Sequence, residues 1–106
     1  MNDNNQNNPD NNEISIELSE ETAEGIYSNL AIITHSNTEF VVDFIRIMPG
    51  VPKAKVKSRI ILTPEHAKRL LGALQDNVNR FEKQNGVIDS RDVPFPLNFG
   101  GPKGEA

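Results

Sequence analysis

Residues 39–47, EFVVDFIRI, decide the fold, because they are apolar at both even and odd positions and still carry Asp43 at the centre. β-Branched and aromatic residues of this kind favour a strand. A run of similar composition, IYSNLAIITH at residues 26–35, precedes it across the short polar break SNT. Two such runs around a break predict a β-hairpin, with Asn37 able to adopt a left-handed conformation in the turn.

A third strand and a helix follow the hairpin. A wider turn is expected at residues 48–54, MPGVPKA, and the alternating residues 55–62, KVKSRIIL, predict a strand after it. At Thr63 the period changes, because Thr63 can cap a helix, Pro64 suits its first turn and Gly86 can end it. The apolar stripe expected on this helix consists of Ala67, Leu70, Leu71, Leu74, Val78 and Phe81.

The order of these elements predicts an α+β domain over residues 13–88. It is an antiparallel β-meander of three to four strands with one long C-terminal helix packed on one face. The fourth strand would be the alternating segment EISIEL at residues 13–18. Residues 1–12 are mostly Asn and Asp and predict a disordered polar tail, whereas residues 89–106 form a C-terminal tail rich in Pro and Gly.

The positions of the two turns predict the strand register. A two-residue loop at residues 36–37 makes partner numbers sum to 73, so that Ile33 lies opposite Phe40. Partner numbers that sum to 102 across the second turn set Asp43 opposite Arg59. One face of the sheet would then meet the helix and carry Ala31, Ile33, Phe40, Val42, Phe44, Val56, Ile60 and Leu62.

The opposite face of the predicted sheet is also apolar. Left in water, it would expose several hundred Å² in one patch, more than a soluble monomer usually shows. A second copy is the simplest cover, since homodimers are the commonest oligomer; the alternatives are a register slip of one residue, or cover by the N-terminal strand and tail. The predicted dimer face consists of Leu30, Ile32, Val41, Asp43, Ile45, Arg59 and Ile61, with Lys57 beside them.

Composition narrows the classes of function. The chain has no cysteine, which excludes disulfides and thiolate metal sites, and its net charge of −4 argues against binding duplex DNA mainly through phosphate contacts. No secretory signal and no run of membrane-spanning length stands out, so a cytoplasmic protein without membrane contact is expected.

No catalytic or metal-binding constellation stands out. His35 and His66 fall on different elements without a third ligand, and the serines have no base at a recognisable spacing. No enzyme activity and no cofactor are therefore predicted. The weakest alternative is a small-ligand or enzymatic site in which His35 lies near Asn29 and Glu39.

Two further features suggest contacts with partners. The basic stretch PKAKVKSR is a candidate polyanion patch, as in β-ribbon readers of nucleic acid, made of Lys53, Lys55, Lys57 and Arg59. Its structural alternative is a solvated strand whose charges discourage aggregation. In the C-terminal tail, Phe95, Leu97 and Phe99 alternate and could dock in a groove on another chain, or the tail could hang free.

Several short motifs follow one another between residues 27 and 88. They are Y-x-N at Tyr27, H-S at His35, E-F-x-x-D-F at Glu39, P-G at Pro49, S-R at Ser58 and T-P-E-H-A-K at Thr63. In this order the chain resembles a family of short bacterial and archaeal proteins known only as a domain of unknown function. The resemblance implies a self-contained small domain, and it brings no activity, ligand or catalytic residue.

The leading hypothesis is a non-enzymatic homodimeric module of otherwise unknown function that binds an unidentified protein partner. The alternative is a nucleic-acid-associated regulatory protein that uses the basic β-ribbon.

Overall fold

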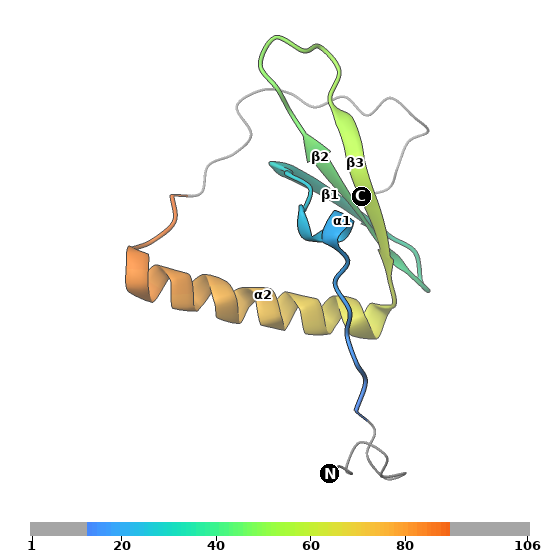
Figure 1. The fold of residues 1–106 in the computed structure, drawn as a ribbon, viewed down its shortest axis with the longest axis vertical. Helices are drawn as coiled ribbons and strands as arrows, with labels where there is room; N and C mark the ends of the chain where they lie inside the picture. Colours follow the sequence, from blue (N-terminus) through green and yellow to red (C-terminus); the bar gives the residue numbers. More distant parts are fainter. Residues whose placement is uncertain (1–12, 90–106) are drawn as a thin grey trace.

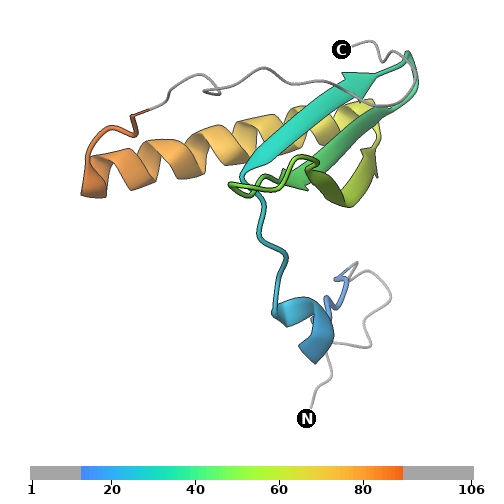
Figure 2. The same ribbon diagram turned by 90° about the horizontal axis from the view of Figure 1, so that it is seen from above.

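The computed structural model describes residues 13–89. Its elements are α1 (Glu20–Ala23), β1 (Leu30–His35), β2 (Phe40–Arg46), β3 (Lys55–Leu62) and α2 (Pro64–Asn85). The strands form one antiparallel sheet in the order β1-β2-β3, and α2 follows at the end of β3 (Figure 1). This arrangement confirms the predicted α+β class. The C-terminal half of α2 extends beyond the sheet in both views (Figures 1 and 2).

The segment of residues 13–18 is not a strand in the described part of the chain, so the sheet has three strands and not four. The next residues form the short helix α1, which the sequence did not predict. Ser19 caps it, since its hydroxyl accepts a hydrogen bond of 3.2 Å from the Thr22 backbone N–H. The prediction of a disordered tail over residues 1–12 lies outside the described residues.

The β1–β2 register differs from the prediction by two residues. Ile33 lies opposite Val42 and His35 opposite Phe40, so partner numbers sum to 75. The turn is centred one residue later than expected, because the Ser36 hydroxyl accepts from the backbone N–H groups of Thr38 and Glu39. Asn37 is not left-handed, since no described residue other than glycine has a positive φ. A shift of two keeps every side chain on its predicted face.

The β2–β3 register is as predicted from Phe40↔Leu62 to Phe44↔Ser58 and then changes. A bulge places Ile45 opposite Val56, and Lys57 has no partner. Val56 therefore shares the face of Ile45 and not that of Phe44, which corrects its predicted place in the core. The turn before β3 is closed by a 3.2 Å hydrogen bond from the Val51 N–H to the Met48 carbonyl, with Gly50 at a φ of 80°.

Both ends of α2 lie where the sequence predicts them. The Thr63 hydroxyl accepts a 3.1 Å hydrogen bond from the His66 N–H, and Pro64 occupies the first turn. Gly86 ends the helix at a φ of 92°, a value that glycine adopts readily.

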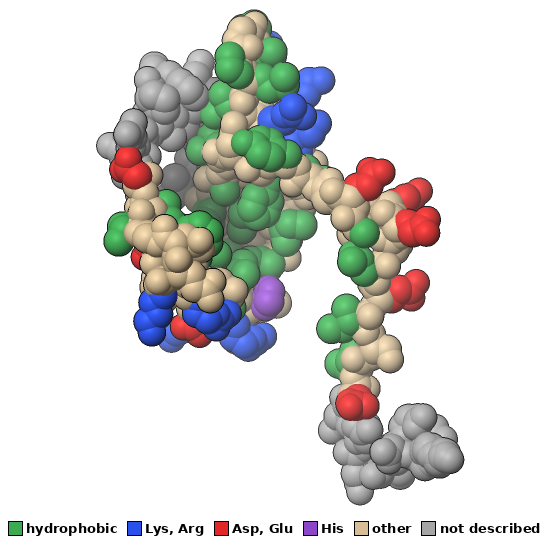
Figure 3. Space-filling view, turned by 60° about the vertical axis from the view of Figure 1, so that its left-hand side comes forward, with side chains coloured by type: hydrophobic (Ala, Val, Ile, Leu, Met, Phe, Trp, Pro, Cys, Tyr) green, Lys and Arg blue, Asp and Glu red, His purple; other side chains and the backbone are tan. Residues whose placement is uncertain are grey.

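The core within one chain is small. Among the described residues only Val42 and Ile45, both on β2, are buried apolar side chains. Ala67 and Val78 of the α2 stripe are half-buried, but Leu71 remains 67% and Leu74 58% exposed. Figure 3 shows hydrophobic side chains at the surface where sheet and helix meet. The helix therefore leaves much of its own stripe and of the sheet uncovered.

Candidate interaction surface

The residues of the predicted dimer face lie together on one side of the sheet. Direct cross-strand pairs join Leu30 to Ile45, Val41 to Ile61 and Asp43 to Arg59, so these side chains share a face. Ile45 is already buried by its own chain, whereas Ile61 at the β3 edge is 58% exposed. The open part of this face thus lies on the β3 side, where the bulge adds Val56.

An ion pair stands in the middle of this face. Arg59 donates from Nε to Asp43 Oδ1 at 2.6 Å and from an Nη atom to Oδ2 at 2.8 Å. The Asp43 side chain is 15% exposed and that of Arg59 62%. The hydrogen bond from Arg59 lowers the pKa of Asp43, against the raising effect of burial, and the Arg59 charge lowers it further. The positive charge of Arg59 thus compensates the negative charge of Asp43. This pair favours the β2–β3 register in which the two residues lie opposite each other.

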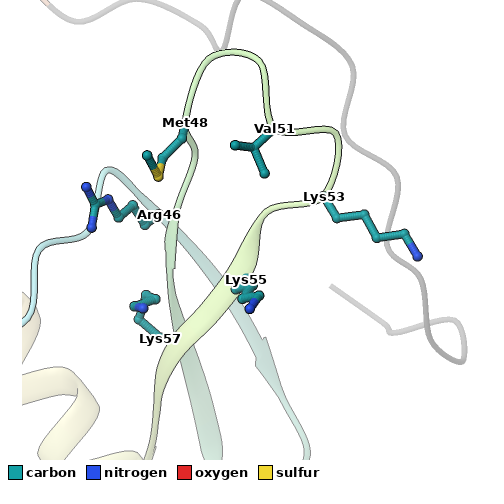
Figure 4. A pocket seen from close by; sticks show the side chains of 6 residues that line it. All are labelled: Arg46, Met48, Val51, Lys53, Lys55 and Lys57. Carbon is teal, nitrogen blue, oxygen red and sulfur yellow. The ribbon is translucent and has the colours of Figure 1, made fainter.

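The predicted polyanion patch divides in two. Arg59 is paired with Asp43 on the predicted dimer face, whereas the three lysines line a pocket of about 290 Å³ at the other end of β3 (Figure 4). Arg46, Met48 and Val51 complete the lining. Arg46 lies opposite Lys55 because of the bulge, and the register read from the sequence had set it elsewhere. We call Arg46, Lys53, Lys55 and Lys57 the basic pocket.

The cations of the basic pocket have no carboxylate partner within residues 13–89. Arg46 lies over the Tyr27 ring, with its guanidinium carbon 5.8 Å from the ring centroid, which is a cation–π distance. The Lys53 side chain points away from the other three (Figure 4), and an anion bound in the pocket would relieve the repulsion between the positive charges that line it.

Ser28 and Asn29, which follow Tyr27, form side-chain hydrogen bonds at the start of the sheet. The Asn29 side chain accepts from the Ile47 N–H at 2.8 Å and donates to the Ile47 carbonyl at 3.0 Å. The Ser28 hydroxyl lies 3.0 Å from the carbonyls of Leu30 and of Ile45. These contacts fix the point at which the chain enters β1. The signal in the sequence is the polar pair Ser28–Asn29 before an apolar run, and the hydrogen bonds of these side chains to β2 and to the residue after it were not predicted.

The two histidines lie on different elements. His35 stacks on Phe40 with ring centroids 5.3 Å apart, and His66 lies in the first turn of α2. Asn29 precedes β1 whereas His35 ends it, so these two side chains do not lie near each other as the weakest alternative expected. Residues 13–89 hold no group of three or more His, Cys, Asp or Glu side chains that could hold a metal ion.

The tail residues that were predicted to dock lie outside the described residues, so their docking stays a prediction. They are Phe95, Leu97 and Phe99. Within the part of the chain that the structure describes, no helix has the length and apolarity needed to cross a membrane.

Fold and surface together define a small α+β domain with an open three-stranded sheet and a partly uncovered helix. The chain belongs to the family described as protein of unknown function (DUF3467), whose model matches residues 1–90. This match confirms the expected membership of an uncharacterised family. No curated protein and no solved structure matches the chain.

Proposed function

We propose that this protein is a non-enzymatic homodimeric interaction module. The observation that carries the proposal is the exposed apolar stripe of α2, where Leu71 and Leu74 are each more than half exposed. In water an amphipathic helix gains little stability from propensity alone, and most comes from packing its apolar face. A 22-residue helix with an uncovered stripe therefore needs a second surface.

The composition of the chain supports the same proposal. A domain of this size buries a low fraction of its surface and commonly depends on disulfides, metals or oligomerisation. The chain has no cysteine. Oligomerisation is a further means, and in a two-fold arrangement a second copy can cover the α2 stripe without another gene product.

The oligomeric state of the full chain tests the proposal. Sedimentation equilibrium at micromolar concentration should give twice the 11.8 kDa chain mass. The mass should fall towards the monomer value on dilution, together with a loss of helical circular dichroism. A stably folded particle of 11.8 kDa over the whole concentration range would contradict the proposal.

An unidentified protein partner is the second half of the proposal. Binding to such a partner predicts a saturable pull-down from cell lysate that survives nuclease treatment. Removal of residues 91–106 should weaken it if the tail residues Phe95, Leu97 and Phe99 make the contact. Unchanged capture by the shortened chain would exclude the tail from this role.

One observation favours the nucleic-acid alternative. Arg46 and three lysines line one pocket without a carboxylate partner in residues 13–89, and Arg and Lys are side chains that commonly contact phosphate. In a gel-shift assay at low salt, Lys55→Glu with Lys57→Glu should then abolish the shift of an oligonucleotide. The control is Lys68→Glu with Arg69→Glu, which removes the same charge from exposed positions of α2. Equal mobility of all samples would exclude this alternative.

A further inference from the structure

The N-terminal arm, residues 13–27, lies apart from the body of its own chain except at its last residue, Tyr27, whose ring contacts Arg46. Figures 2 and 3 show it leading away from the sheet, with α1 on it. Its apolar residues Ile14, Ile16 and Leu18 alternate along an extended segment, and Ile16 is 93% exposed. Alternation of this kind is typical of a β-strand that has one face buried. Nothing in the described part of its own chain covers it.

The arm is also strongly acidic. Between residues 13 and 27 it carries five glutamates and no Lys or Arg: Glu13, Glu17, Glu20, Glu21 and Glu24. Figure 3 shows these carboxylates along the arm. Glu17, Glu20, Glu21 and Glu24 make no ion pair within residues 13–89. Four glutamates of the arm thus have no cationic partner in residues 13–89, in a chain whose basic pocket has no carboxylate partner there.

The basic pocket lies beside an edge of the sheet. Within residues 13–89, the order β1-β2-β3 gives the strand β3 a neighbour on one side only, so its outer edge can pair with another strand. Lys55 and Lys57 stand on this strand, and Ile60 and Ile61 follow them with exposed side chains. The β3 edge therefore offers positive charge, apolar surface and backbone hydrogen-bonding groups along one line.

We propose that the N-terminal arm of one copy lies along β3 of a second copy. The glutamates of the arm then face the basic pocket, and Ile14, Ile16 and Leu18 cover apolar side chains at the β3 edge. This inference rests on the proposed homodimer and says which segment joins the two copies. The six residues 13–18, fully extended, span ~20 Å, the length of a typical strand.

The anchoring of the arm explains why it reaches another copy. Ser28 and Asn29 fix the chain at β1, the edge strand opposite to β3. From there the arm leads outward (Figure 2). To reach its own β3 edge, the arm would have to turn back across the width of the sheet. In a two-fold dimer, the edge of the neighbouring copy can lie where the arm already points.

Charge reversal tests the exchange. One variant carries Glu17→Lys and Glu21→Lys in the arm, and a second carries Lys55→Glu and Lys57→Glu in the pocket. Each alone sets like charges against each other, so its dimer should be at least about tenfold weaker than that of the original chain. The control is Glu39→Lys with Asp76→Lys, which makes the same charge change at exposed positions outside the arm and should leave the dimer unchanged.

Mixing the two variants distinguishes exchange between copies from docking within one chain. In a mixed dimer, the Lys-bearing arm of one copy meets the Glu-bearing pocket of the other, and the unchanged arm meets the unchanged pocket. Native mass spectrometry with one variant isotope-labelled should therefore show heterodimers in preference to both homodimers. Their affinity should lie within about threefold of that of the original chain, since opposite charges face each other again.

The remaining outcomes would overturn the inference. Equal dimerisation of both variants and the original chain would exclude the contact, and loss of oligonucleotide binding by the pocket variant in that case would make nucleic acid the occupant. Rescue only when both reversals stand in one chain, without heterodimers on mixing, would mean that the arm docks on its own chain. A monomeric original chain would overturn the proposed homodimer itself, which is a distinguishable result.

Discussion

The central strand β2 and the helix α2 have similar amounts of apolar side chain and very different surroundings. β2 has a hydrogen-bonded strand on each side, and its Val42 and Ile45 are buried within one chain. α2 continues for 22 residues and contains no buried residue, although its ends are well capped. The difference shows that hydrogen bonding and capping specify an element, whereas burial of its apolar face requires a surface of matching extent. One chain supplies that surface for β2 but not for all of α2.

The largest effect is expected when charge is placed on the α2 stripe. In the proposed dimer, Leu71→Asp with Leu74→Asp should weaken dimerisation by at least about a hundredfold, because a buried Leu contributes ~1.5–3 kcal/mol. Sedimentation equilibrium measures this. The matched control, Gln75→Asp with Gln84→Asp, adds the same charge at exposed polar positions and should leave the dimer intact. Equal affinity of the two double variants would mean that α2 needs no partner.

The next effect lies in the core of β2. Ile45→Ala should lower the free energy of unfolding by about 2–4 kcal/mol, because Ile45 is 6% exposed and its removal leaves a cavity. Chemical denaturation at a fixed protein concentration measures the change, since dimer stability depends on concentration. Val51→Ala, in the exposed turn, is the control and should change stability by less than about 0.5 kcal/mol. A similar loss in both would show that β2 is not the core.

A smaller effect is expected at the N-terminus of α2. Thr63→Ala removes the hydroxyl that accepts from the His66 N–H, so stability should fall by about 1 kcal/mol. Thr63→Ser keeps the hydroxyl and should restore most of that stability. Thermal unfolding followed by circular dichroism compares the three chains. If Ser and Ala behave alike, the cap does not contribute.

The smallest effect concerns the ion pair beside the core. Arg59 lowers the pKa of Asp43 in the folded chain, so Asp43 stabilises the fold above its ordinary pKa of 3.8. This stabilisation is lost as the pH falls from 3.8 towards the lower folded-state pKa. Asp43→Asn should thus be less stable than the original chain near neutral pH, and the difference should shrink below about pH 4. Denaturation at several pH values, with Asp76→Asn as control, measures this; a difference that is constant with pH would contradict it.

The sequence predicted the fold well where local signals are strong. Thr63, Pro64 and Gly86 set the ends of α2, and the alternation of residues 55–62 set β3. The registers were less predictable, because they depend on side-chain hydrogen bonds such as those of Ser36, which moved the first turn by one residue. The bulge at Lys57 has no signal in the alternation, since a strand pattern reads the same until the pairing is known.

The candidate surface was predicted in part. The seven residues of the predicted dimer face do share one side of the sheet, and the pairing of Asp43 with Arg59 was predicted from the register. Arg46 was missed because only the bulge sets it opposite Lys55. The separation of Arg59 from the lysines was missed because period-two alternation treats a strand as uniform along its length. The isolation of the arm needed the structure, since an alternating segment does not say which chain it will cover.

The unpaired Lys57 separates β3 into two halves with opposite phase. Before Lys57 the even-numbered Val56 lies on the face of Ile45, whereas after Lys57 the odd-numbered Arg59 and Ile61 lie on that face. The half of β3 that carries Lys55 and the half that carries Ile60 and Ile61 therefore follow independent alternation patterns. Residues of the turn can be exchanged, or the turn lengthened, without reversing the orientation of Ile60 and Ile61, so the charge of this tip can diverge among related chains while the packed half of the sheet keeps its pattern.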